Sequence, residues 1–453
     1  MSSCAALPTN YLWTWDHSTN WVLDDPGLQT WGCYNPYTKR PETYVEDYRR
    51  LTDMCVESGF GGILIWGFLR DSHGGVAAAQ EVASYAASQG VRILPGLGTT
   101  DFGGAYYEGR HEFNLETFLE RHPECAMIEK DGTPARQRLC PTHPKAIDWV
   151  KRGAEWLMET FEIGGVNLEN GDFLTCYCPR CRERYMELAD AVEYYKGQLD
   201  GYGPSLEALG PYLKDKWITY ATYSGFNPTA LHGDAPLGAD TAGGGVPTFV
   251  DVFPDEAIGQ WTLTCMVRPQ PLPLTNYLDC GVPEEVYDNP RWPRGIKVPT
   301  RRGVGFLHQA SQWGDTRYRQ MVSCVKEACL RAPESGLEGV VIHGELTDRY
   351  TPWWLNYQAL VHFSQRPQDT LRDFARERLA PELGGEDEAQ TFIEALALWD
   401  AGEDVSAITQ DAHRYSNKHS ASPTRETCRR AQRWIWLCYL LVRRDCQWTP
   451  GFF

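Results

Sequence analysis

Charged side chains that could do chemistry stand at the ends of short apolar runs in this sequence. Asp16 closes YLWTW, Glu169 and Asp172 close GVNLENGD, and Glu345 follows VVIHG. In a pair of carboxyl groups, one can donate a proton while the other acts as a base or nucleophile. This is the chemistry of glycosidic-bond hydrolysis. Glu169 and Glu345 are therefore a candidate pair for a retaining mechanism. The alternative for both is that they bind sugar hydroxyls or pair with arginine.

A second group of candidates lies in RQRLCPTHP, residues 136–144. Pro141 and Pro144 restrict the backbone on both sides of His143. Pro144 also suits the first turn of a helix, so a plain loop-to-helix junction is the alternative. Arg138 could hold a carboxylate through two parallel hydrogen bonds, which gives His143 a neighbour suited to an acidic substrate.

Three cysteines, Cys176, Cys178 and Cys181, form a CxCxxC run. Thiols at this spacing can bind zinc or an iron–sulfur cluster, but a structural zinc needs four ligands. Cys140 supplies the fourth thiol if its loop meets this one. Reduced thiols or a local disulfide are the favoured interpretation. We therefore expect no cofactor, and metal binding stays an open question.

An alternation of strands and helices must position these residues. From residue 11 to about 348, short β-branched or aromatic runs alternate with Gly- or Asp-rich loops and helical spacing. The pattern predicts an α/β fold, a closed (β/α)8 barrel of the TIM type, with its chemistry at the C-terminal strand ends. The predicted strands are Tyr11–Asp16, Gly62–Phe68, Arg92–Gly96, Gly165–Glu169, Trp217–Tyr223, Gln260–Val267, Gly303–His308 and Gly339–Gly344. The predicted helices between them are Thr43–Ser58, Val76–Ser88, Pro144–Phe161, Arg182–Lys196 and Thr316–Ala332.

The pattern after Asp348 is helical only. No long Pro- or Ser-rich linker intervenes, so we divide the chain into a catalytic barrel, residues 1–350, and a C-terminal helical extension packed on it, residues 351–453. The predicted helices of this part are Pro352–Phe363, Gln368–Leu379, Glu386–Ala401 and Thr424–Cys446.

Composition narrows the choice of partner. The net charge of −17 disfavours nucleic acid, and the lack of an 18-residue apolar run disfavours a membrane span. The chain holds 17 Trp, 23 Tyr and 16 Phe, whose flat faces suit sugars. The start lacks the basic and apolar regions of a signal peptide, and the 15 cysteines are scattered, so we expect a cytoplasmic protein. A homodimer is an open alternative to a monomer.

The order of several short motifs resembles a known family. The aspartate in YLWTWD, the Arg-x4-His unit in RLCPTHP, the NLENGDF strand and the Asn-Tyr in TPWWLNYQAL resemble glycoside hydrolase family 156, the inverting exo-sialidases, within the wider group of (β/α)8-barrel glycoside hydrolases. The similarity covers roughly residues 10–360.

The resemblance implies roles for individual residues. Asp16 would be the base that activates water, His143 the proton donor, Arg138 a clamp for the substrate carboxylate and Asn356 a substrate contact. Arg70, at the end of the second predicted strand, is our candidate for a second carboxylate-binding arginine. Sialic acid carries a carboxylate beside its anomeric carbon, so attack by water avoids the repulsion that a carboxylate nucleophile would meet.

The leading hypothesis is therefore an exo-α-sialidase that releases terminal sialic acid from glycans with inversion. A retaining exo-glycosidase on a neutral or uronic sugar, using Glu169 and Glu345, is the first alternative. The second is a non-catalytic carbohydrate-binding barrel whose aromatic residues stack on sugars.

Overall fold

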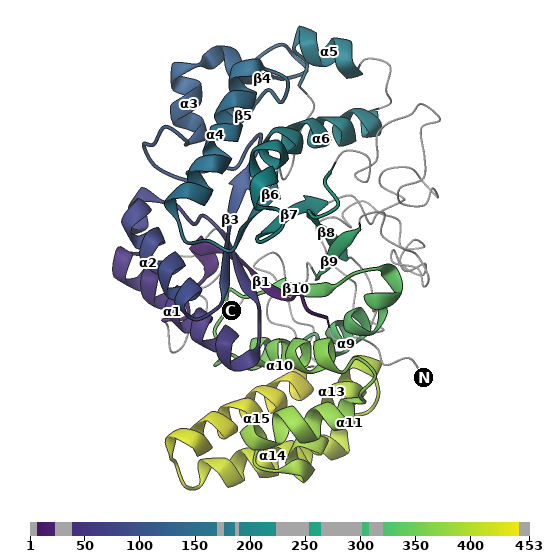
Figure 1. Cartoon of the computed structure of the whole chain (residues 1–453). Coiled ribbons are helices and arrows are strands. Elements are labelled where there is room, and N and C mark those ends of the chain that lie inside the picture. The colour runs from purple at the N-terminus through teal and green to yellow at the C-terminus, as the bar shows by residue number, and fades with distance from the viewer. Residues whose placement is uncertain are drawn as a thin grey trace.

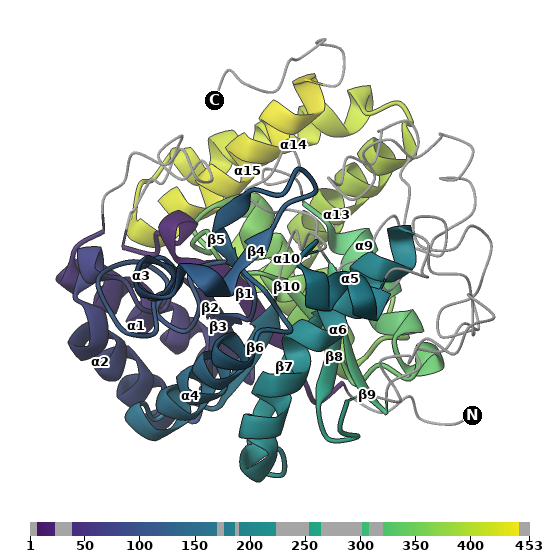
Figure 2. The same ribbon diagram turned by 90° about the horizontal axis from the view of Figure 1, so that it is seen from above.

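The computed structural model describes residues 7–22, 39–169, 176–185, 190–222, 253–263, 301–307 and 320–443. Eight parallel strands close into a barrel in the order β1-β10-β9-β8-β7-β6-β3-β2 (Figures 1 and 2). They are β1 (Tyr11–Trp15), β2 (Gly62–Trp66), β3 (Arg92–Gly98), β6 (Gly165–Glu169), β7 (Trp217–Thr222), β8 (Ile258–Leu263), β9 (Arg302–Leu307) and β10 (Gly339–His343). Each begins within two residues of its predicted start. The predicted (β/α)8 fold is thus confirmed.

Helices surround the barrel, and most of them follow the prediction (Figure 2). They are α1 (Pro41–Ser58), α2 (Gly75–Ser88), α4 (Pro144–Thr160), α6 (Asp190–Leu209), α9 (Val322–Arg331) and α10 (Thr351–Gln365). The predicted helix Arg182–Lys196 overlaps α5 (Pro179–Tyr185) and α6, and residues 186–189 between them lie outside the described residues. The predicted helix Thr316–Ala332 begins later, at Val322, and residues 316–319 lie outside the described residues.

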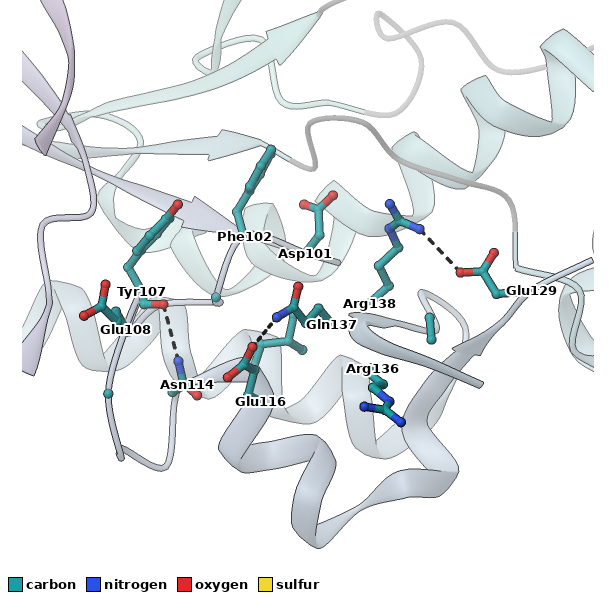
Figure 3. Close-up of a pocket in the computed structure, with 14 residues that line it drawn as sticks. Asp101, Phe102, Tyr107, Glu108, Asn114, Glu116, Glu129, Arg136, Gln137 and Arg138 are labelled. Atoms are coloured by element: carbon teal, nitrogen blue, oxygen red, sulfur yellow. Dashed lines mark hydrogen bonds and ion pairs between the residues drawn. The ribbon is translucent and has the colours of Figure 1, made fainter. Parts of the chain in front are cut away.

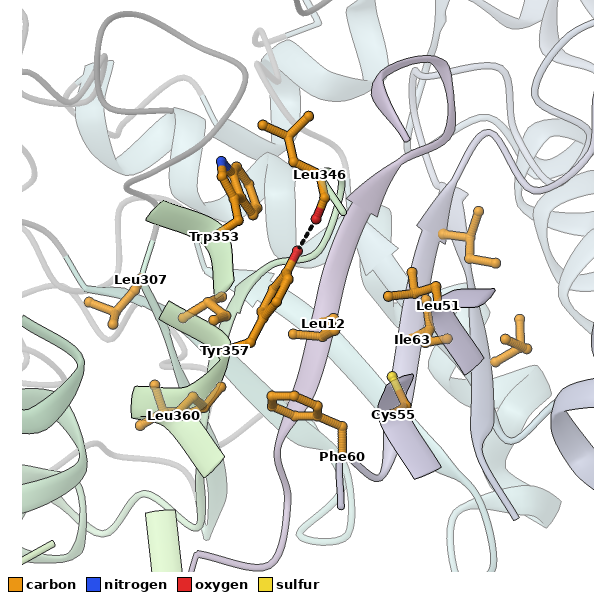
Figure 4. Close-up of a cluster of buried hydrophobic side chains, with 14 of the residues drawn as sticks. Leu12, Leu51, Cys55, Phe60, Ile63, Leu307, Leu346, Trp353, Tyr357 and Leu360 are labelled. Atoms are coloured by element: carbon orange, nitrogen blue, oxygen red, sulfur yellow. Dashed lines mark hydrogen bonds between the residues drawn. The ribbon is translucent and has the colours of Figure 1, made fainter. Parts of the chain in front are cut away.

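Apolar side chains form two layers, one outside the barrel and one inside it. Alternate residues of a strand point to opposite faces, so Leu12 joins the outer layer while Trp13 and Trp15 fill the interior. Figure 4 shows the outer layer between β1, β2 and α10, where the Tyr357 hydroxyl donates to the carbonyl of Leu346 at 2.6 Å. The interior is therefore a packed core, and reactive groups must lie at its rim.

An insertion between β3 and β6 was not predicted. It holds α3 (Leu115–Arg121) and an antiparallel hairpin of β4 (Ala126–Ile128) and β5 (Pro134–Leu139). The Leu139 N–H donates to the carbonyl of Thr100 at 2.7 Å, just beyond the end of β3. This bond places the hairpin at the C-terminal edge of the barrel, where active sites of such barrels lie.

The predicted helical extension, residues 351–453, begins with α10, and Figure 1 shows the helices that follow as a layer beneath α9 and α10. It contains α11 (Leu371–Phe374), a π-helical turn (Ala375–Leu379), α12 (Ala380–Leu383), α13 (Glu386–Ala401), α14 (Ser406–Ser420) and α15 (Arg425–Arg443). The prediction lacked α14 and gave Gln368–Leu379 as one helix. Among the described residues, no helix combines the length and apolar character that crossing a membrane requires.

Candidate active site at the barrel rim

Asp16 follows β1 directly and is surrounded by basic groups. Its Oδ2 lies 3.1 Å from His73 Nδ1 and 3.3 Å from Arg70 Nε, and its Oδ1 lies 3.4 Å from Lys39 Nζ. The residue is only 1% exposed. Burial alone would raise the pKa of this carboxyl, but the three basic neighbours, His73 first, outweigh burial and hold the pKa well below 3.8. Asp16 is therefore a permanently charged carboxylate at neutral pH.

Arg70 lies between Asp16 and the outer part of the rim. Its Nη1 pairs with Glu108, and its guanidinium stacks 4.5 Å from the ring centre of Tyr107. Gly67 (φ +85°) permits this arrangement, since a Cβ there would stand 2.8 Å from Arg70 Nε and 3.1 Å from Asp16 Cβ. The guanidinium is thus shared by two carboxylates and a ring, and it is 13% exposed.

Glu345 lies two residues after β10, beside the end of β1. Its Oε1 accepts the backbone N–H of Trp15 at 3.1 Å, and the side chain is buried. The imidazole of His17 interacts with this carboxylate and with Asp16. Burial, and then Arg70, lower the pKa of His17 to about 4 against the opposing effect of both carboxylates. His17 is therefore neutral at pH 7 and can act there as a hydrogen-bonding group.

The loop after β3 places an aromatic residue over the barrel interior. Among the described non-glycine residues, Phe102 alone has a positive φ, 50°. Its ring lies 5.9 Å from that of Trp15 and 5.5 Å from that of Trp66, which explains how the strained backbone is held. Trp66 in turn fits because Gly96 leaves room, since a Cβ at position 96 would stand 2.4 Å from the Trp66 ring.

A cavity of about 670 Å³ opens beside these residues (Figure 3). Its wall includes Asp101 and Phe102 from the loop after β3, and Tyr107 and Glu108, which both contact Arg70. The volume of this cavity lies within the range of small-molecule binding sites, and its wall is aromatic and charged.

Arg138 forms another part of the cavity wall, from β5. Its Nη1 lies 3.4 Å from Glu129 Oε1, and its side chain is one-third exposed. Figure 3 shows Arg138 and Asp101 reaching toward the same space from different elements. The structure thus places Arg138 where it could meet a carboxylate bound in the cavity.

His143 lies apart from Asp16 in its contacts. It caps α4, with Nδ1 accepting the N–H of Lys145 at 3.3 Å and lying 3.4 Å from Cys125 Sγ. The acceptor role of Nδ1 places the proton of the neutral ring on Nε2. Burial, and then Arg180, lower the pKa of His143. The alternative interpretation, that His143 caps a helix, is therefore confirmed. The pairing of His143 with Asp16 in catalysis stays a prediction.

The side chain of Asn356 makes a hydrogen bond that supports the fold. It is buried on α10, and its Oδ1 accepts the backbone N–H of Met321 at 2.6 Å, directly before α9. This bond satisfies a donor at the start of α9. The substrate contact that the resemblance implies for Asn356 stays a prediction.

The remaining predicted carboxylates differ in how far the structure describes them. Glu169 ends β6 and is buried, close enough to Tyr11 that its charge, after burial, helps to raise the pKa of the phenol. Asp172 lies outside the described residues. The retaining pair of Glu169 and Glu345 therefore stays a prediction, with both members at C-terminal strand ends.

The structure adds residues that the sequence did not assign to the site. His73 and Asp101 follow strand ends, so their positions were visible in the sequence. Lys39 and Tyr107 belong to no motif, and only the fold brings them to the rim. The structure also brings Cys140 to Cys176, Cys178 and Cys181, so the two cysteine loops do meet.

No family model and no curated protein matches the sequence. Similar solved structures include a β-N-acetylhexosaminidase from Bacteroides fragilis, with 12% identity, 84% of this chain and 73% of that chain covered, and a TM-score of 0.48. A maltogenic α-amylase from Thermotoga neapolitana has 10% identity, coverage of 80% and 77%, and a TM-score of 0.43. A GH138 enzyme targeting pectin rhamnogalacturonan II has 11% identity, coverage of 88% and 44%, and a TM-score of 0.47.

Proposed function

We propose that this protein is a glycoside hydrolase, an exo-sialidase that removes terminal sialic acid with inversion at the rim around Asp16. The observation that carries the proposal is the ion pair of Asp16 with Arg70, next to a cavity whose wall also holds Arg138. A carboxylated sugar needs cationic recognition, and a charged carboxylate beside it can serve as a base.

Arg70 would couple substrate binding to the basicity of Asp16. A substrate carboxylate that binds the guanidinium would compete with Asp16 and Glu108 for it. A weaker ion pair with Arg70 would raise the pKa of Asp16, so Asp16 would be a better base when substrate is bound. Water attack, rather than attack by Asp16 itself, also avoids the repulsion between two carboxylates. Because the net charge of −17 is screened within about 8 Å at physiological salt, these local arginines can decide recognition.

The proton donor of the proposal is His143, as the family resemblance implies. Its imidazolium form would deliver the Nε2 proton to the leaving oxygen, which leaves the neutral ring whose Nδ1 accepts from Lys145. Asp101 is a second candidate donor because it lines the cavity. The variants His143→Gln and Asp101→Asn separate them. An aryl sialoside has a good leaving group, so loss of the true donor should reduce turnover of a natural sialoside far more than that of the aryl substrate.

A retaining glycosidase is the second candidate function, because Glu345 and Glu169 are buried at C-terminal strand ends. In that case Glu345→Gln should abolish turnover on a neutral or uronic sugar. Under our proposal the same variant keeps its acceptor for the Trp15 N–H and loses at most about tenfold in kcat.

The deciding experiment follows an α-sialoside by NMR and identifies the sialic acid anomer that is released first. Inversion gives the β-anomer first, and Asp16→Asn should lower turnover by at least about 1000-fold. Asp47→Asn is a matched control, because Asp47 is also buried and pairs with Lys39 at 2.6 Å. Release of the α-anomer first would overturn the mechanism. Saturable glycan binding without turnover across a panel of aryl glycosides would favour a binding barrel instead.

A further inference from the structure

Four cysteines from two segments converge beside the hairpin. Cys140 follows β5, while Cys176 and Cys178 precede α5 and Cys181 lies in it. All four are buried, and their Sγ atoms lie within 4.8 Å of one another. Cys140 Sγ lies 3.7 Å from both Cys178 Sγ and Cys181 Sγ. Thiol groups from two separate parts of the sequence thus form one compact cluster.

The spacing of the sulfur atoms matches a metal site and does not match a disulfide. Zn²⁺ binds thiolates at about 2.3 Å in a tetrahedron, whose edge is then about 3.8 Å. A disulfide needs sulfur atoms about 2.05 Å apart, far closer than the 3.7 Å from Cys140 Sγ to Cys178 Sγ. Four thiolate ligands also close the coordination sphere, which is typical of structural rather than catalytic zinc.

The surroundings supply donors that suit metal-bound thiolates. The backbone N–H of Ile128 donates to Cys176 Sγ at 3.4 Å, and the Thr142 hydroxyl lies 3.1 Å from Cys181 Sγ. The N–H of Tyr177 donates to the carbonyl of Ile128 at 2.8 Å, which joins the cysteine loop to β4. Such hydrogen bonds orient metal ligands and stabilise their negative charge.

We propose that Cys140, Cys176, Cys178 and Cys181 bind one structural Zn²⁺ that fastens the segment after β6 to the β4–β5 hairpin. Arg138 lies two residues before Cys140, so the metal would also fix the strand that carries this part of the cavity wall. The site does not depend on the proposed sialidase activity, because its ligands and its readout are separate from any sugar.

The test measures metal in the full-length protein purified without chelators from zinc-supplemented medium. Elemental analysis should find about one zinc per chain, and X-ray absorption should show four sulfur ligands at about 2.3 Å. Cys178→Ser should lose most of this zinc. Cys125→Ser is the matched control, because Cys125 is buried and contacts His143 but is not in the cluster.

A second readout keeps the test decisive if Cys178→Ser folds poorly. Removing zinc from the wild-type protein with a chelator should speed hydrogen exchange in residues 126–139 more than in α13, which lies far from β4, β5 and α5 in Figure 1. Iron in place of zinc, nitrogen or oxygen ligands, a Cys140–Cys178 disulfide by mass spectrometry, or equal zinc loss in Cys125→Ser would each overturn the proposal.

Discussion

Asp16 and His73 form a buried pair, with Asp16 Oδ2 3.1 Å from His73 Nδ1. The imidazole of His73 also packs on Tyr44 of α1, with ring centres 3.9 Å apart. The carboxylate at the end of β1 is therefore held by the loop after β2 and, through that imidazole, by α1. Such support fixes a reactive group more firmly than a loop alone could.

Asp16→Asn should destabilise the fold as well as stop turnover. The variant leaves three basic groups without their shared anion, so we expect a loss of about 3 kcal/mol in the free energy of unfolding at pH 7. Urea denaturation measures this loss. Asp47→Asn should also be destabilised but should keep its turnover, which separates the structural effect from the catalytic one.

The stability cost of Asp16→Asn should depend on pH. Because the folded-state pKa of Asp16 is lowered, the charged carboxylate stabilises the fold above its ordinary pKa of 3.8, and this contribution declines as the pH falls through the lowered value. The difference between wild type and variant should thus be constant between about pH 5 and 8 and narrow below about pH 4. A difference that widens on acidification would contradict the assigned direction of the pKa shift.

Arg70→Lys should weaken recognition of a carboxylated sugar while keeping the positive charge. Lysine loses the planar fork and the stacking on Tyr107, so kcat/KM for a sialoside should fall by at least about tenfold, equivalent to about 1.4 kcal/mol. Arg302→Lys is the control, because Arg302 pairs with Glu338 at 2.7 Å where β9 begins, at the opposite end of the barrel. Equal kinetics in both variants would remove Arg70 from the proposed site.

The barrel strands were predictable because both of their faces are buried. Such strands appear in sequence as short runs of branched and aromatic residues, and β2 (GILIW) is an example. The helix α14 was missed because its buried positions, Ile408, Ala412, Ser416 and His419, include polar residues. The buried positions recur at helical spacing, but because some of them are polar, the sequence shows no apolar helical pattern. The strand β5 (PARQRL) is short, charged and largely exposed, so neither alternation nor hydrophobicity marks it.

The site was only partly predictable for a different reason. Asp16, Arg70 and Arg138 stood out because charged residues near strand ends or in stiff loops are visible in sequence. Lys39 belongs to no motif, so its contact with Asp16 could not be predicted from the sequence. The roles of His143 and Asn356 as caps depend on neighbouring backbone N–H groups, which sequence spacing alone does not identify.

Asn356→Ala should lower stability, and unchanged kinetics in this variant would argue against a substrate contact of Asn356. Removing Oδ1 leaves the Met321 N–H without this acceptor at the start of α9, which should cost about 1 to 2 kcal/mol. Thermal unfolding and sialoside kinetics together test this. Asn417→Ala, on the exposed side of α14, should change stability by less than about 0.5 kcal/mol. A raised KM in Asn356→Ala would instead support the substrate contact that the family resemblance implies.

Gly67→Ala should separate the Arg70–Asp16 pair without changing either charged residue. The added methyl group would stand 2.8 Å from Arg70 Nε at a φ of +85°, so the guanidinium must shift. Gly59→Ala is a close match, because Gly59 has a φ of +82° and a methyl group added there would meet no atom within 4 Å. Both variants should lose about 1 kcal/mol of stability through backbone strain. Only Gly67→Ala should also lose activity, by at least about tenfold in kcat/KM, since only there does the substitution displace a charged group of the site. Equal activity in the two variants would show that the position of Arg70 over Asp16 does not matter for turnover.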